Sequence, residues 1–139
     1  MTASKLFFDT SPFIYLIENH PEFYSKTFDV MSKASGNNVQ FCTSVLTFVE
    51  YCIKPEQINR LDLIVEFEDL LENLDFTIAK ITINTAKIAY KLRAKYAFLK
   101  AMDALQLASA IDLNCHSFLT NDKKLEKITE IKVIILSDL

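Results

Sequence analysis

Short runs of apolar residues alternate along the chain with longer segments in which apolar residues recur every three or four positions. Short apolar runs bounded by turn residues predict β-strands, whereas longer periodic segments predict amphipathic helices. The predicted strands cover residues 5–8, 39–42, 76–81, 117–120 and 132–136. Because helices separate them, the pattern predicts an α/β fold with a largely parallel sheet of about five strands and right-handed crossovers.

Capping residues indicate where the first helices begin and end. Ser11 suits the N-cap and Pro12 the first helical position of a helix over residues 11–19. Gly36 is placed to end the next helix. Ser44 can cap a helix that starts at residue 45 and ends near Pro55.

Three further helices are predicted over residues 58–74, 83–96 and 103–114. In the first of them the apolar residues recur with a period close to that of an α-helix, which predicts one buried face. The residues predicted on that face are Ile58, Leu61, Ile64, Val65, Leu70 and Leu71.

The composition predicts a single globular domain over residues 1–139, because 50% of the residues are hydrophobic and 24% are charged. A single glycine and three prolines leave little room for linkers. No apolar stretch approaches the roughly 20 residues that span a bilayer, and no signal-length apolar region precedes Asp9. Three cysteines without a C-x-x-C pair indicate free thiols in a reducing compartment. We therefore expect a cytoplasmic protein with no membrane partner.

The net charge of −3 argues against binding nucleic acid by bulk electrostatics, but the charges are unevenly distributed. Residues 61–79 contain acidic residues and no Lys or Arg, whereas residues 80–100 contain basic residues and no Asp or Glu. Two solvated helix faces would explain this pattern, and so would a positive surface for phosphates within residues 80–100. Both interpretations stay open.

Two aspartates follow predicted strands: Asp9 comes directly after the first, and Asp122 comes just after the fourth. In an open parallel sheet, ligands bind beyond the carboxyl ends of the strands. If these two strands are neighbours, they lie about 4.8 Å apart and both carboxylates overhang one crevice. Each aspartate also has an ordinary explanation, since Asp9 can cap a helix and Asp122 lies in a turn-rich string.

Two more acids lie in mostly apolar helices. Glu50 lies in "SVLTFVEYCI", where the apolar surroundings predict substantial burial, although a surface pair with Lys54 is the simpler alternative. Asp103 opens "DALQLASAI", where the helix dipole alone would favour an acid. Four acids that converge would repel one another unless a cation lay among them. Mg²⁺ or Mn²⁺ prefers such oxygen ligands and suits phosphoryl chemistry, whereas two histidines and unpaired cysteines disfavour zinc.

The order of four motifs, "FFDTSPFIY", "SVLTFVEYC", "DALQLASAI" and "FLTNDKKL", resembles that of the PIN-domain ribonucleases, particularly the VapC-type toxins of toxin–antitoxin pairs. The resemblance runs from residue 5 to about residue 136. It implies a PIN-like three-layer fold with a parallel sheet of order 3-2-1-4-5 flanked by helices. It also implies metal-binding and catalytic roles for Asp9, Glu50, Asp103 and Asp122, with support from Thr10 or Ser11, Thr120 and Asn121.

The function implied by the resemblance is metal-dependent hydrolysis of RNA with Mg²⁺ or Mn²⁺, by a toxin that forms a homodimer and is blocked by a cognate antitoxin. Some members carry a further acid where this chain has Lys124, which leaves the number of metal ions open. The alternatives are a catalytically silent PIN-like binding module, a structural protein with unrelated acids, and a phosphatase of the haloacid dehalogenase type. The last needs a second acid where this chain has Ser11.

Overall fold

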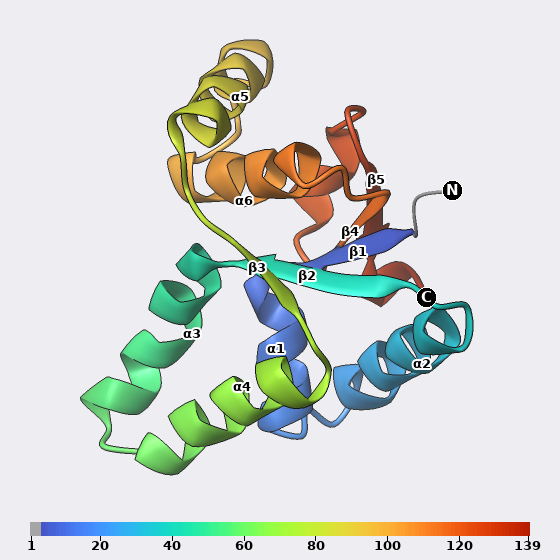
Figure 1. Cartoon of the computed structure of the whole chain (residues 1–139), viewed down its shortest axis with the longest axis vertical. Coiled ribbons are helices and arrows are strands. Elements are labelled where there is room, and N and C mark those ends of the chain that lie inside the picture. The colour runs from blue at the N-terminus through green and yellow to red at the C-terminus, as the bar shows by residue number, and fades with distance from the viewer. Residues whose placement is uncertain (1–3) are drawn as a thin grey trace.

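The computed structural model describes residues 4–139 and contains a parallel sheet of five strands in the order β3-β2-β1-β4-β5 (Figure 1). The sheet order and the parallel pairing confirm the expected fold class. The strands are β1 (Lys5–Phe8), β2 (Gln40–Ser44), β3 (Thr77–Ala79), β4 (Ser117–Thr120) and β5 (Lys132–Ile135). The predicted bounds of β1 and β4 are correct, and those of the other strands differ by one to a few residues.

Helices cover both faces of the sheet, which makes three layers (Figure 1). On one face lie α1 (Thr10–Ile17), α2 (Phe23–Gly36), α3 (Val45–Gln57) and α4 (Leu61–Asn73), and on the other lie α5 (Ile83–Lys95) and α6 (Ala101–Asp112). Two short 3₁₀ helices follow β4 and β5: η1 (Lys123–Lys127) and η2 (Leu136–Asp138). Among residues 4–139, no helix is both long enough and apolar enough to cross a membrane.

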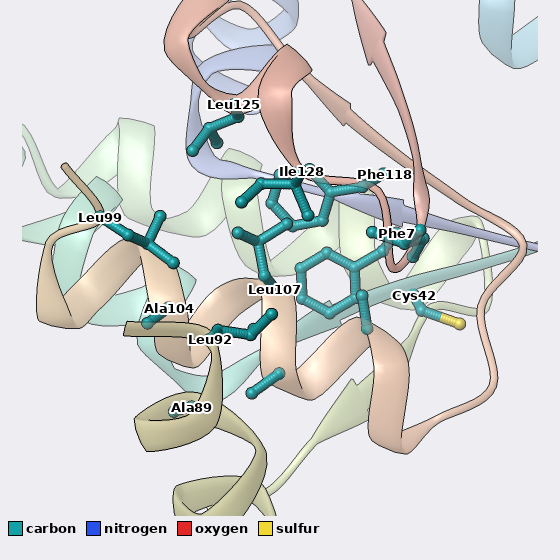
Figure 2. Close-up of a cluster of buried hydrophobic side chains, with 13 residues drawn as sticks. Phe7, Cys42, Ala89, Leu92, Leu99, Ala104, Leu107, Phe118, Leu125 and Ile128 are labelled. Carbon is teal, nitrogen blue, oxygen red and sulfur yellow. The ribbon is translucent and has the colours of Figure 1, made fainter. Parts of the chain in front are cut away.

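Each face of the sheet has its own core, because successive side chains of a strand point to opposite faces. On the α5–α6 face, Phe7 of β1 stacks on Phe118 of β4 with ring centroids 5.4 Å apart, next to Leu107 and Ile128 (Figure 2). On the other face, Phe8 is surrounded by aromatic rings that include Phe13 and Phe76. Burial of these large rings on both faces fixes the register of the central strand β1.

The first helix begins two residues earlier than predicted. Its N-cap is Asp9 and not Ser11, because Asp9 has an extended backbone and its side chain accepts a hydrogen bond from the Thr10 N–H. The Ser11 hydroxyl instead accepts from the Asn121 N–H at 3.2 Å. The Gly36 prediction is correct, since α2 ends at that residue.

The α3–α4 hairpin shows where sequence signals were misleading. Ser44 caps α3 as predicted, but the helix continues through the buried Pro55 to Gln57. A proline in the last turn removes one hydrogen bond without ending the helix there. Ile58 then forms the C-cap of α3, and Asn59 has a left-handed backbone with φ of 58°. For this reason α4 starts at Leu61 instead of residue 58.

The predicted buried face of α4 is wrong in part. Leu61 and Val65 are exposed, and the fully buried residues of this helix are Phe67 and Leu71. The Phe67 ring contacts Phe13 in an edge-on arrangement at 5.3 Å between centroids. A large aromatic side chain buries more area than a valine, so Phe67 decides which face of the helix turns inward.

Candidate active site

Two neighbouring central strands bring the first two acids to the carboxyl edge of the sheet. Strands β1 and β4 pair directly, with Phe8 opposite Leu119. The next residue, Asp9, continues the pairing, because its N–H donates to the Leu119 carbonyl at 2.9 Å. Asp122 lies two residues beyond the end of β4. Asp9 and Asp122 therefore lie at the same edge of the sheet, as expected for residues that follow two neighbouring strands.

Asp9 is held tightly by hydrogen bonds to both carboxylate oxygens. Oδ1 accepts from the Thr10 N–H at 2.9 Å, and Oδ2 accepts from the Thr120 hydroxyl at 2.8 Å. Burial nevertheless raises the pKa of Asp9 from its ordinary 3.8 to about 6, and the negative charges of Glu50 and Asp103 add to the rise. Burial and nearby negative charges disfavour the free carboxylate, so a carboxyl group in this position binds a proton or a cation more readily than one in water.

Glu50 is exposed, which corrects the expectation that it would be buried. Helix α3 is not covered all round, because Val49 and Ile53 are 61% and 56% exposed. Glu50 nonetheless reaches toward the edge of the sheet, since its Oε1 accepts from the Thr10 hydroxyl at 2.9 Å. The alternative of a surface ion pair between Glu50 and Lys54 is not formed among the described residues.

Asp103 lies in the first turn of α6, as predicted. Burial raises the pKa of Asp103, and the charges of Asp122 and Glu50 raise it further, whereas Lys100 and Lys124 lower it. The four acids thus act on one another electrostatically although they come from four separate segments. The structure brings them to the same end of the sheet.

The polar neighbours of these acids have distinct contacts. Thr10 contacts Glu50, and Thr120 contacts Asp9 while its hydroxyl oxygen also accepts from the Asp122 N–H at 3.1 Å. The side chain of Asn121 does not contact the acids. Its Nδ2 donates to the Tyr15 hydroxyl at 3.0 Å, and its Oδ1 accepts from the Ser137 N–H at 2.9 Å. Asn121 therefore fixes the loop that carries Asp122.

One residue near the acids was missed by the sequence analysis. Gln106 of α6 is 1% exposed, and its amide nitrogen lies 3.4 Å from Glu50 Oε1 and 2.9 Å from the Thr47 hydroxyl. The signal was present in the sequence, because Gln106 is an amide within an otherwise apolar or small-residue stretch of a buried helix. A buried amide requires polar partners, and that requirement should have led to Glu50.

The donor set of these acids suits a hard divalent cation, because carboxylate oxygens are the ligands that Mg²⁺ and Mn²⁺ prefer. Within residues 4–139, no three Asp, Glu, His or Cys side chains stand close enough to hold one ion as they are. Like charges keep apart, and hydroxyl and amide donors hold several of these oxygens in their present positions. The residues fit such a cation in chemistry and location, and their side chains would have to come closer together to bind it.

Comparison with known proteins adds independent information. The model of the PIN domain family matches residues 6–131. Among curated protein sequences, none matches the chain significantly.

Solved structures with the same fold include chains of three toxin–antitoxin complexes. One is VapBC2 from Rickettsia felis bound to a promoter DNA fragment, with a TM-score of 0.75, 17% identity, and coverage of 94% of this chain and 98% of that chain. Another is VapBC-1 from nontypeable Haemophilus influenzae, with a TM-score of 0.72, 19% identity, and coverage of 96% and 98%. The third is a toxin–antitoxin complex from Klebsiella pneumoniae, with a TM-score of 0.68, 21% identity, and coverage of 97% and 98%. At these identities the likeness concerns the fold.

Proposed function

This chain belongs to the PIN domain family, and from that membership we propose that it is a metal-dependent endoribonuclease and the toxin of a toxin–antitoxin pair. The proposed catalytic and metal-binding residues are Asp9, Glu50, Asp103 and Asp122. Thr10 and Thr120 would orient two of these acids, and Ser11 and Asn121 would hold the loops that carry Asp9 and Asp122.

The observation that carries this proposal is the gathering of four acids from separate segments at the carboxyl edge of the sheet. Burial raises the pKa of Asp9 to about 6, and repulsion by the negative charges of Glu50 and Asp103 adds to the rise. A protein that only needed a stable fold would gain by replacing such acids with neutral residues. This argument also disfavours a catalytically silent binding module, which would have no use for the repulsion.

In the proposed reaction, the carboxylates would hold Mg²⁺ or Mn²⁺ and the RNA phosphate would approach the same edge. A bound divalent ion supplies an activated water and stabilises charge on the leaving oxygen. Asp9 is ionised at neutral pH, because its pKa of about 6 lies below 7. The Thr120 hydroxyl and the Thr10 N–H keep its two oxygens in fixed directions, which limits the reorganisation needed when a cation binds.

The decisive experiment measures cleavage of RNA by the purified protein with Mg²⁺ or Mn²⁺ and with EDTA. We expect cleavage only with the metal ion, and we expect Asp9→Asn to abolish it while the protein stays folded. Asp112→Asn is the matched control: Asp112 lies on α6, as Asp103 does, but it accepts hydrogen bonds from Asn84 and Thr85 away from the four acids.

Undiminished cleavage in EDTA would overturn the mechanism. Binding of RNA without any cleavage, under conditions in which Mn²⁺ is bound, would favour the silent module. A fall in cleavage for Asp112→Asn as large as that for Asp9→Asn would show that the four acids have no special role.

We place the proposed antitoxin contact in an apolar groove of about 820 Å³ between α1, α2 and α4. Its lining includes Leu16, Tyr24, Phe28, Met31, Leu70 and Leu74, and the acids Glu66 and Asp69 border it. Tyr24 and Phe28 are 37% and 53% exposed although their rings stack. Such a groove suits the apolar face of an amphipathic helix with basic residues along its margin. The structural neighbours are themselves toxin–antitoxin complexes, which supports a partner of this kind.

The proposed homodimer contact uses the exposed apolar side of the α3–α4 hairpin. Val49 and Ile53 lie one turn apart on α3, and Leu61 and Val65 lie one turn apart on α4, all more than 50% exposed. Helix α4 carries acids and no Lys or Arg, whereas α5 carries Lys and Arg and no acid. Helix α5 lies on the other face of the sheet, so its charges stay outside this contact, and the four exposed apolar side chains carry the proposal.

A further inference from the structure

The inference concerns Glu50, the one proposed ligand that lies on an exposed helix face. Both hydrogen bonds that hold its carboxylate arrive at the same atom, Oε1: one from the Thr10 hydroxyl at 2.9 Å and one from the Gln106 amide at 3.4 Å. Among residues 4–139, no donor bonds Oε2. A carboxylate held in this way has one oxygen fixed by the protein and one oxygen available to a ligand.

Hydrogen bonds hold both ends of the Gln106 side-chain amide. Its Oε1 accepts from the Ser44 hydroxyl, and its amide nitrogen donates to the Thr47 hydroxyl and to Glu50. A carboxylate can only accept, so the Gln106 amide must present its nitrogen to Glu50 and its oxygen to Ser44. Gln106, Ser44 and Thr47 are all at most 1% exposed, so the bonds of Gln106 to Ser44 and Thr47 are formed away from water, where they are strong.

The network ties Glu50 to the frame of the sheet. Ser44 is the last residue of β2 and the N-cap of α3, and Thr47 lies one turn before Glu50 on the same side of that helix. Thr47 shares a hydrogen bond with Thr43 at 2.8 Å, and Thr43 donates to the Phe8 carbonyl at the end of β1. Residue 8 precedes Asp9, so one continuous chain of bonds links the position of Glu50 to that of Asp9.

We propose that Gln106 is a positioning residue that orients Glu50, with the help of Thr10, so that Glu50 Oε2 binds the divalent cation. This proposal rests on the proposed metal-dependent function and adds a residue to it. Any side chain without an N–H donor at position 106 would leave Glu50 with a single hydrogen bond. Glu50 is exposed, so it would then rotate more freely into solvent.

The test measures the affinity for Mn²⁺ by calorimetry, without RNA. Gln106→Met keeps an unbranched side chain of similar length but removes the donor. We expect it to weaken Mn²⁺ binding roughly 10-fold or more, as is usual when a group that orients a metal ligand is lost. Ser109→Ala is the matched control, because Ser109 is also buried on α6 at 1% exposure but its hydroxyl bonds only the Leu105 carbonyl.

A double-mutant cycle separates positioning from general structural damage. In the background of Glu50→Ala, Gln106→Met should weaken Mn²⁺ binding no further, because its target has gone. Equal losses with and without Glu50, or an equal loss in Ser109→Ala, would overturn the proposal.

A measurement on the unaltered protein covers the case in which Gln106→Met fails to fold. The side-chain amide resonances of Gln106 should shift when Mg²⁺ is added, because charge is drawn from Glu50. Amide resonances that stay unchanged while Mg²⁺ binds would overturn the proposal. Mn²⁺ binding without RNA cleavage would remove the proposed ribonuclease activity and leave the role of Gln106 intact.

Discussion

Asp9 combines two features that usually occur apart. It is the N-cap of α1, a position that favours an ionised carboxylate, and it is a member of an acid cluster, which favours the neutral form. Burial and the neighbouring charges outweigh the hydrogen bonds that favour the ionised form, since the pKa of Asp9 rises to about 6. The fold therefore tolerates ionised Asp9 at neutral pH without deriving stability from it.

The raised pKa of Asp9 makes the free energy of unfolding depend on pH. An acid whose pKa is higher in the folded state binds its proton more tightly there, so the metal-free protein should lose stability as the pH rises from about 4 to about 6. The full effect is on the order of 3 kcal/mol and persists above pH 6. Asp9→Asn should remove this loss, because asparagine also caps a helix.

Urea unfolding in EDTA between pH 4 and pH 8 checks this prediction. The variant should be more stable than the unaltered protein at pH 8, and the two should converge toward pH 4. An Asp9→Asn protein that is less stable by several kcal/mol at pH 8 would mean that the carboxylate is structural.

Sequence reasoning singled out Asp9, Asp103 and Asp122 because each stands next to a recognisable element. Asp9 and Asp122 follow strands, and Asp103 opens a helix. It misjudged Glu50, because an apolar helix was taken to be buried when much of its apolar side is exposed. It missed Gln106 because the amide in an apolar helix was overlooked, and its partners lie on distant segments that no local pattern connects to it.

At the scale of elements, α3 serves two surfaces. Its inner side carries Thr47 and Tyr51, both buried, and its outer side carries Val49 and Ile53. Exposed apolar residues that form a contiguous patch mark a protein–protein contact more often than scattered ones do. The same helix thus connects the proposed dimer contact with the proposed ligand Glu50.

We predict that Ile53→Lys converts the proposed homodimer into a monomer, because it places a charge in an apolar contact. Sedimentation equilibrium of the purified protein measures the change. Leu139→Lys is the control, since Leu139 is exposed to a similar degree, 57% against 56%, and lies far from α3 (Figure 1). A protein that is already monomeric before substitution would refute the proposed dimer.

The bounds of an element were predicted correctly where one clear sequence signal marked them. Strands β1 and β4 are short, apolar and bounded by polar residues, so their limits were correct. The start of α4 was not, because the left-handed Asn59 interrupts a pattern that looks continuous in sequence. Its buried face depends on Phe67 meeting Phe13, a contact between segments that periodicity alone does not reveal.

At the scale of the whole molecule, the groove and the acids lie toward opposite ends of α1. Asp9 caps the start of this helix, and the groove is lined by Leu16 and Ile17 at its end. A partner helix seated in the groove therefore needs a further segment to reach the acids. We expect an antitoxin of two parts: an apolar anchor and an extension that covers the carboxyl edge.

Phe28→Glu tests the anchor. Coexpression with the protein of an adjacent small reading frame should yield a stable complex, and this substitution should weaken it at least 10-fold, since a central aromatic anchor commonly contributes about 2 kcal/mol or more. RNA cleavage by the isolated protein should not change. Phe98→Glu, at an exposed aromatic outside the groove, is the control. Equal weakening by both substitutions would argue against the groove as the contact.

The strand order has a consequence for how the protein comes into being. The central strand β1 is translated first, but its neighbour β4 comes more than a hundred residues later, after every helix from α1 to α6. A nascent chain that stops before Ser117 carries Asp9, Glu50 and Asp103, yet it lacks the strand that supplies Thr120 and Asp122. The proposed site therefore stays incomplete until translation is nearly finished, and we expect the nascent chain to lack the proposed ribonuclease activity.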